Sequence, residues 1–117
     1  MPNRRIDWTA QCGLRFARTV HALELSHEEL YNKYNVSRSC WGMWIGGKNP
    51  LNPWVMTQFC NDYKISMDWL YLNDKQGLTK RMLEKIDALE KENWRPRFRT
   101  EKGRRKRRHI LPVAVAA

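Results

Sequence analysis

Hydrophobic side chains recur every three or four residues along most of this chain, which is the spacing of one face of an α-helix. The first such segment covers residues 9–23, where Phe16 and Val20 share a face. Arg15 and Arg18 fall on the other side of the same helix. The pattern predicts an all-α fold built from short helices.

Helix-capping residues divide the next stretch into two short helices. Ser26 begins a capping box with Glu29, because its hydroxyl can accept the amide hydrogen three residues further on. The helix after this cap ends before Asn35, which tolerates the positive φ that a tight turn between helices often needs. Ser37 is the next N-cap, and it predicts a helix that runs to about Ile45.

Further helices are expected after this pair. Asn52 and Pro53 supply an N-cap and a proline at the first helical position, which predicts a helix over residues 53–63. A short helix is predicted over residues 67–72, and a charged helix over residues 79–93.

The last predicted helix carries an apolar stripe on one side. The stripe could pack back on the preceding helices, or it could pair two subunits along a dimer seam. We favour the seam and therefore expect a homodimer. The stripe consists of Leu78, Met82, Ile86 and Leu89.

The chain thus divides into a globular domain over residues 9–73, a helical segment over 78–94 and a basic tail over 95–117. The net charge is +10, and nine of the 22 Lys and Arg residues lie between residues 95 and 108. We expect this tail to be disordered alone. It could be a solvated end, an arm on the DNA backbone, or a ligand for RNA or acidic lipid, and we favour the arm. The basic residues of the arm are Lys102, Arg104, Arg105, Lys106, Arg107 and Arg108.

The cysteines and histidines predict neither a metal site nor a catalytic centre. The three cysteines include no Cys-x-x-Cys pair, and the three histidines do not complete a zinc pattern. We therefore expect free thiols in a reducing cytosol, no cofactor and no enzymatic activity. The chain has no apolar run long enough for export or for a membrane span, which predicts a cytoplasmic protein. The residues concerned are Cys12, Cys40, Cys60, His21, His27 and His109.

One ordered set of short motifs carries a family resemblance. The motifs are Leu25-Ser26-His27-Glu28-Glu29-Leu30, Asn35-Val36-Ser37-Arg38-Ser39, Trp44, Gly47-Lys48 and Ile65-Ser66-Met67-Asp68-Trp69-Leu70. Over residues 12–72 they resemble the phage-repressor and Cro type of helix-turn-helix protein, also called the xenobiotic-response-element family. The resemblance implies a five-helix lambda-repressor-like domain, whose third helix lies in the major groove of DNA.

The same resemblance implies which residues contact double-stranded DNA. The expected base contacts are Arg38, Ser39, Gly42 and Met43. Among them, Arg38 can bond both acceptors of a guanine, and Met43 can pack on a thymine methyl group. The expected phosphate contacts, which set register rather than sequence, are Ser26, His27, Ser37, Lys48 and Asn49.

Several positions depart from the family pattern. Tyr31 stands where the family usually has a small Ala, and we expect its ring to lie over the turn with the hydroxyl in water. Asn35 stands where Gly is common. Val20 and Ile45 occupy the positions of an Arg–Glu pair found in many members, and we expect these two apolar side chains to touch.

The six tryptophans favour packing over base stacking. Those expected at inward or loop-packing positions are Trp41, Trp44, Trp54 and Trp69. Trp8 and Trp94 lie outside the family match and are expected to cap the dimer.

These observations favour a sequence-specific DNA-binding transcriptional regulator, acting as a dimeric repressor on an inverted repeat in a phage or bacterial promoter. Two alternatives stay open. One is an antitoxin-like or other protein-interaction module, and the other is a non-specific nucleic-acid binder driven by the basic tail. No small-molecule ligand is evident.

Overall fold

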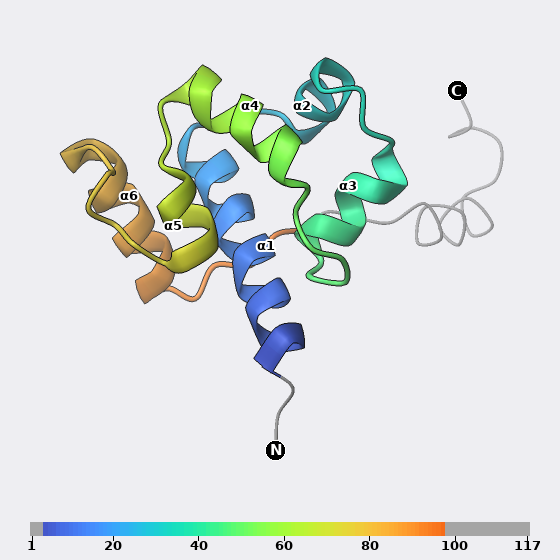
Figure 1. The fold of residues 1–117 in the computed structure, drawn as a ribbon. Helices are drawn as coiled ribbons and strands as arrows, with labels where there is room; N and C mark the ends of the chain where they lie inside the picture. The colour runs from blue at the N-terminus through green and yellow to red at the C-terminus, as the bar shows by residue number, and fades with distance from the viewer. Residues whose placement is uncertain (1–3, 98–117) are drawn as a thin grey trace, which may run out of the picture.

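A computed structural model describes residues 4–97 of the chain. In this range the protein is all-helical, with six helices and no strand (Figure 1). The helices are α1 (Arg4–Ala22), α2 (His27–Lys33), α3 (Arg38–Ile45), α4 (Pro53–Tyr63), α5 (Met67–Leu72) and α6 (Lys80–Lys91). The predicted arm, Lys102 to Arg108, lies outside the described residues. None of these helices is long and apolar enough to cross a membrane.

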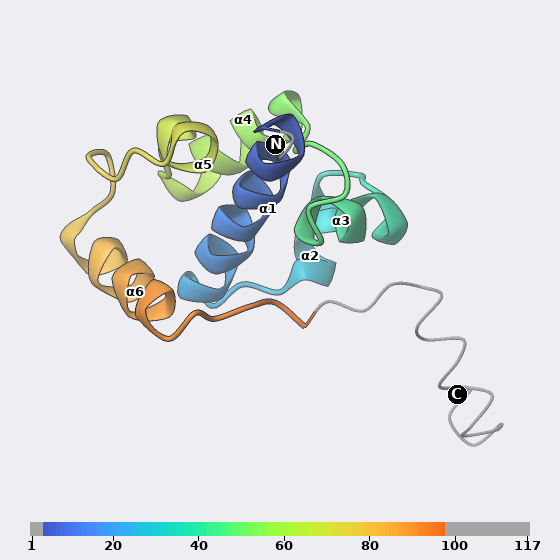
Figure 2. The same cartoon turned by 90° about the horizontal axis from the view of Figure 1, so that it is seen from below.

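Helix α1 runs through the middle of the molecule. Helix α3 lies on one side of it and helices α5 and α6 lie on the other (Figure 2). Phe16 of α1 is fully buried, and its ring meets Trp41 at 5.3 Å and Phe59 at 5.0 Å between centroids. On the α5 side, the Trp69 indole donates a hydrogen bond of 2.8 Å to the Thr19 hydroxyl. The central position of α1 thus joins the short helices into one core.

Helix α1 is buried on both sides, including the side that carries its two arginines. Arg15 and Arg18 are each only 8% exposed. Arg15 Nε donates to the Leu70 carbonyl at 3.0 Å. Arg18 donates from Nε and from a terminal nitrogen to the Trp94 carbonyl, at 3.2 and 3.1 Å. Because α5 and the segment after α6 cover this side, the guanidinium groups must bond to backbone oxygens there.

The structure also extends α1 at its start, to Arg4 rather than residue 9. Trp8 gives a reason for the extension. Its indole donates to the Tyr71 carbonyl at 3.0 Å, and its ring lies 6.1 Å from that of Tyr71. Trp8 therefore packs on its own chain, and so does Trp94, whose ring stacks on His21 at 4.5 Å. Neither ring was expected to be part of the domain.

The predicted caps are confirmed. The Ser26 hydroxyl accepts from the Glu29 amide at 3.3 Å, and the Ser37 hydroxyl accepts from the Cys40 amide at 3.1 Å. Asn35 has a φ of 58°, as the tight turn between α2 and α3 required.

Two glycines let α1 and α3 approach closely. A Cβ atom at Gly13 would collide with the carbonyl oxygen of Trp44. Gly47, which comes after α3, has a φ of +74°, and a Cβ atom there would lie 2.8 Å from the Cα atom of Ala10. The end of α3 thus rests directly on the backbone of α1, which determines how α3 is held on the molecule.

The apolar stripe of α6 packs back on the domain, so the expected dimer seam is corrected. Its four residues, Leu78, Met82, Ile86 and Leu89, are between 0% and 9% exposed in the single chain. Lys85 on α6 also donates to the Ala22 carbonyl at the end of α1, at 3.2 Å. The side chains cannot pair two subunits while they fill the core of one.

Two aromatic residues also differ from expectation. Tyr31 was expected to reach water, but it is only 7% exposed, and its ring packs edge-on against Trp41 with 6.2 Å between the ring centroids. Trp54 is 69% exposed, because it stands in the first turn of α4, on the side away from the buried Val55 and Met56. Of the six tryptophans, Trp41, Trp44 and Trp69 are buried as predicted.

Candidate nucleic-acid interface

Helices α2 and α3 form a compact pair joined by the turn at residues 34–37. The amide of Val36 donates to the Tyr31 carbonyl at 2.8 Å, which closes the chain back onto α2. Ser37 then starts α3 as its N-cap. Local hydrogen bonds therefore set the direction in which α3 leaves the turn.

Trp41 holds the inner side of α3. Its side chain is fully buried and its ring lies 5.6 Å from that of Trp44 and 5.3 Å from that of Phe16. Its indole nitrogen donates to Nδ1 of His27 across 2.9 Å. Since a helix turns about 100° per residue, residues 39 and 43 then fall on the side away from Trp41.

The expected base contacts are partly brought together on that outer side. Ser39 is exposed and Met43 is 38% exposed. Arg38 is half-buried at the start of the helix. Gly42 is buried and offers no side chain, so its predicted role is to let the helix backbone approach the bases. The exposed side chains of α3 are therefore Ser39 and Met43.

The loop after α3 carries two of the expected phosphate contacts. Lys48 and Asn49 are both exposed. Their amides donate to the Met43 carbonyl at 2.9 and 3.2 Å, so the loop folds back against the end of α3. This arrangement keeps the backbone of both residues next to the end of α3.

The start of α2 differs from a simple cationic site. Burial lowers the pKa of His27 to about 4, and the nearby His21 adds to the effect. His27 is therefore neutral at pH 7, with Nδ1 accepting from Trp41 and the proton on Nε2. The expected contact of His27 with phosphate stays a prediction, and it would be a hydrogen bond from a neutral ring.

Few cations surround this surface. Glu28 and Glu29 occupy the first turn of α2, and Lys33 at its end is held by Asp62 at 3.2 Å. Over residues 4–97 there are 15 Lys and Arg residues against 11 Asp and Glu residues. The described part of the chain is thus only mildly basic, and more than half of the net positive charge of +10 lies after it in the sequence.

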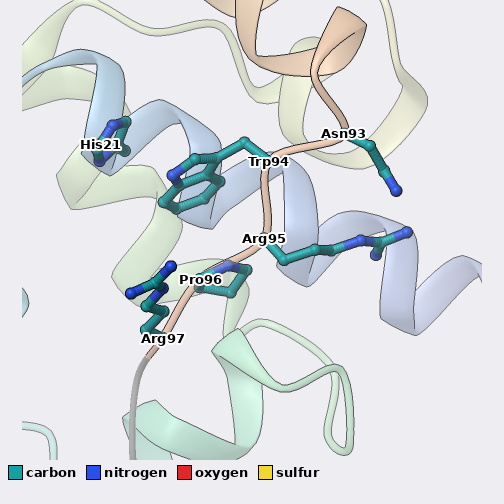
Figure 3. A pocket seen from close by; sticks show the side chains of 6 residues that line it. All are labelled: His21, Asn93, Trp94, Arg95, Pro96 and Arg97. Carbon is teal, nitrogen blue, oxygen red and sulfur yellow. The ribbon is translucent and has the colours of Figure 1, made fainter.

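A second feature was not found from the sequence. The segment after α6 lines a hollow of about 610 Å³ together with the end of α1 (Figure 3). Its residues are His21, Asn93, Trp94, Arg95, Pro96 and Arg97. The rings of His21 and Trp94 face each other, while Arg97 lies on their side of the segment and Arg95 points the other way (Figure 3). The sequence offered one signal for this docked segment, namely Trp94 directly before a basic run that contains Pro96.

Among residues 4–97, no group of three or more His, Cys, Asp or Glu side chains could hold a metal ion. Cys12, Cys40 and Cys60 are free thiols, and burial raises the pKa of Cys60 to about 11, so this thiol stays protonated at neutral pH. Comparison with known protein families, with curated proteins and with solved structures finds no match to this chain.

Proposed function

We propose that the chain is a sequence-specific regulator that binds double-stranded DNA through α2 and α3, used as a helix-turn-helix unit. The observation that carries the proposal is the division of α3 into two sides. Trp41 anchors the inner side in the core, while Ser39 and Met43 are exposed on the outer side. A helix held in this way can enter the major groove, which is about 12 Å wide, without disturbing the domain.

Arg38 is the main base reader in this proposal. Its guanidinium can bond both N7 and O6 of a guanine, which discriminates against other bases by about 1–3 kcal/mol. Ser39 can donate to or accept from several bases, and Met43 offers an apolar contact for a thymine methyl group. Because Ser39 and Met43 are the only exposed side chains of α3, DNA shape contributes to the selection of the site.

Phosphate contacts would come from Lys48 and Asn49 beside α3, and from Ser26 and Ser37 at the two caps. The carboxylates of Glu28 and Glu29 repel phosphates near the start of α2. The basic tail, as an arm on the DNA backbone, supplies the positive charge that this surface lacks.

Regulation is proposed to be repression by a homodimer on an inverted repeat of a phage or bacterial promoter, where bound protein excludes polymerase. Two copies would place their α3 helices about 34 Å apart, one turn of DNA. The surface that pairs them must be other than the stripe of α6, since that stripe is buried in each chain.

A second candidate is a module that binds a protein partner, as antitoxins do. Three large apolar side chains favour it, because Ile6, Trp54 and Leu72 are 65%, 69% and 71% exposed. Apolar side chains of this size mark an interaction surface where they form one contiguous patch.

The deciding experiment is selection of bound duplexes from a random library at about 150 mM salt, a concentration that limits non-specific binding. Wild type, Arg38→Ala and the control Arg81→Ala, an exposed residue of α6, are run in parallel. We expect an inverted repeat whose guanine preference is lost with Arg38→Ala and kept with Arg81→Ala. Equal recovery of all sequences by wild type would contradict the proposal and leave the tail, or a protein partner, as the basis of function.

A further inference from the structure

The segment at residues 93–97, which we call the strap, is fixed to the domain at its start. Asn93 has a φ of 52°, which turns the chain after α6, and the Trp94 amide donates to the Leu89 carbonyl at 2.9 Å. The Trp94 carbonyl accepts both hydrogen bonds from Arg18, and its ring stacks on His21 with 29° between the planes. Arg18, His21 and Trp94 together are called the latch.

The latch satisfies a buried charge. Arg18 is 8% exposed, and burial lowers its pKa, while Glu90 nearby favours the charged form and Arg95 opposes it. A buried guanidinium needs hydrogen-bond acceptors, since an N–H group that is buried without one loses the hydrogen bonds it made to water. The Trp94 carbonyl receives two of these N–H groups. The strap is therefore held by a contact that the core itself requires.

The strap also has a direction. It leaves the end of α6 and passes the C-terminal end of α1 toward the side of the molecule where α2 and α3 lie (Figure 2). Pro96 restricts Arg95 to extended conformations, so the chain does not turn back onto α6. Arg95 and Arg97 are both exposed. The chain thus leaves the described part of the domain on the α2–α3 side, with its charges outward.

The position of this exit matters because the basic run comes next in the sequence. Lys102 is five residues beyond Arg97 and Arg108 is eleven beyond it, so they lie within about 17 and 37 Å of Arg97 along an extended chain. The second length is close to one turn of DNA, about 34 Å. The basic run can therefore track the backbone next to a site occupied by α3, where Glu28, Glu29 and a neutral His27 leave positive charge scarce.

We infer that the latch aims the basic tail at the duplex that α3 binds, so that the tail contacts the phosphates flanking the site. Trp94 is a positioning residue in this arrangement: it does not contact DNA, but it fixes the direction in which the chain leaves the domain. The inference rests on the proposed DNA-binding function. Without the latch, the strap would not be fixed to α1, and the basic tail would leave the domain in no set direction. The effective concentration of its charges at the flanking phosphates would then fall.

The test uses a duplex that carries the selected site between long flanks, and compares affinity and hydroxyl-radical protection for five full-domain proteins. They are wild type, the chain ending at Arg97, Trp94→Ala, Trp94→Phe, and a chain with a flexible Gly-Ser linker of about 12 residues inserted after Arg97. Trp94→Ala removes the ring that stacks on His21. It keeps the positive charges of the tail and the backbone carbonyl that accepts from Arg18. The linker leaves the latch intact but removes the direction that it gives to the tail. Thermal unfolding checks that each variant folds. If Trp94→Ala does not fold, the linker variant alone tests the inference.

We expect wild type and Trp94→Phe to protect the site and the flanking backbone. The truncated chain should protect the site alone. Trp94→Ala and the linker variant should lose the flanking protection and bind at least about fivefold more weakly, toward the value of the truncated chain. Flanking protection and affinity equal to wild type in both of these variants would overturn the inference, and so would a truncated chain that binds like wild type. Absence of specific protection by wild type would overturn the proposed function itself.

Discussion

The indole nitrogen of Trp41 donates a hydrogen bond to Nδ1 of His27 across 2.9 Å, which ties the inner side of α3 to the first turn of α2. The ring centroids lie 6.3 Å apart, and the two planes meet at 69°. The bond requires an unprotonated Nδ1, so the same contact that orients α3 also depends on pH.

The first prediction is that stability falls as the pH is lowered from about 6.5 to about 4. Burial lowers the pKa of His27 to about 4 in the folded chain, whereas an unfolded chain has a value near 6.5. The unfolded state therefore takes up the proton first. Neutral His27 therefore contributes up to about 3 kcal/mol to the free energy of unfolding. This contribution is complete above about pH 6.5 and is lost as the pH falls toward about 4.

Urea unfolding of wild type and His27→Gln between pH 7 and pH 4 checks this prediction. The variant should lose most of the pH dependence over this interval. His21→Gln is the control and should retain it, because burial is the larger cause of the shift at His27. A wild-type free energy of unfolding that stays constant from pH 6.5 to pH 4 would contradict the assignment.

The second prediction concerns the contact between α1 and α3. Gly→Ala inside a helix usually stabilises a protein by about 1 kcal/mol. At Gly13 the sign should reverse, because the new Cβ would collide with the backbone carbonyl of Trp44, which cannot rotate away. We expect a loss of about 1–3 kcal/mol in the free energy of unfolding, measured with denaturant. Gln11→Ala, at an exposed position of α1, should change it by less than about 0.5 kcal/mol.

The third prediction is that Val20 and Ile45 touch. Both belong to one buried core, at 1% and 4% exposure. The coupling energy of a double-mutant cycle measures whether the two side chains interact. The double mutant Val20→Ala/Ile45→Ala should differ from the sum of the single mutants by at least about 0.5 kcal/mol. The control pair is Ile45 of α3 and Ile86 of α6, which should be additive because the two helices lie on opposite sides of α1 (Figure 2). Additivity in both pairs would contradict the expected contact.

Much of the local structure could be predicted from the sequence because it depends on residues a few positions apart. The N-caps at Ser26, Ser37 and Asn52 each accept an amide hydrogen from the residue three positions on, at 3.3, 3.1 and 3.0 Å. The positive φ of Asn35 is a local requirement of the same kind. These features delimit α2, α3 and α4 without any knowledge of the tertiary fold.

The features that could not be predicted are those that a distant segment decides. Arg18 is buried only because the strap, 76 residues away at Trp94, returns across α1. The periodicity of α1 shows one apolar face and cannot reveal that the polar face is covered as well. The stripe of α6 is ambiguous for the same reason, since an apolar face has the same sequence pattern whether its own core or a second subunit covers it.

In the candidate site, too, features set by nearby residues could be predicted and features set by the tertiary fold could not. Ser39 and Met43 could be assigned to the outer side of α3 from helical periodicity alone. The neutral state of His27 could not, because the pKa of the ring is lowered chiefly by burial in the folded chain. Nor does the sequence indicate that Gly42 is covered.

The fourth prediction separates the charge of the tail from the selectivity of α3. Removing residues 98–117 deletes seven Lys and Arg residues and one Glu. Each phosphate that the tail neutralises contributes about 0.9 to the slope of log affinity against log salt, so the slope should flatten by about 3 or more if half of these cations contact DNA. The sequence preference should not change, because phosphate contacts do not read bases.

Arg38→Ala is the matched comparison for that measurement. It removes one cation from α3, so its salt slope should change by no more than about 0.9, while its preference for guanine at one position weakens by about 1–3 kcal/mol. Fluorescence anisotropy on the selected duplex and on a scrambled duplex, across a salt series, gives both quantities. Equal slopes for the full and truncated chains would exclude the tail as a DNA arm. A tail deletion that abolishes the preference for the selected duplex would instead show that sequence reading does not reside in α3.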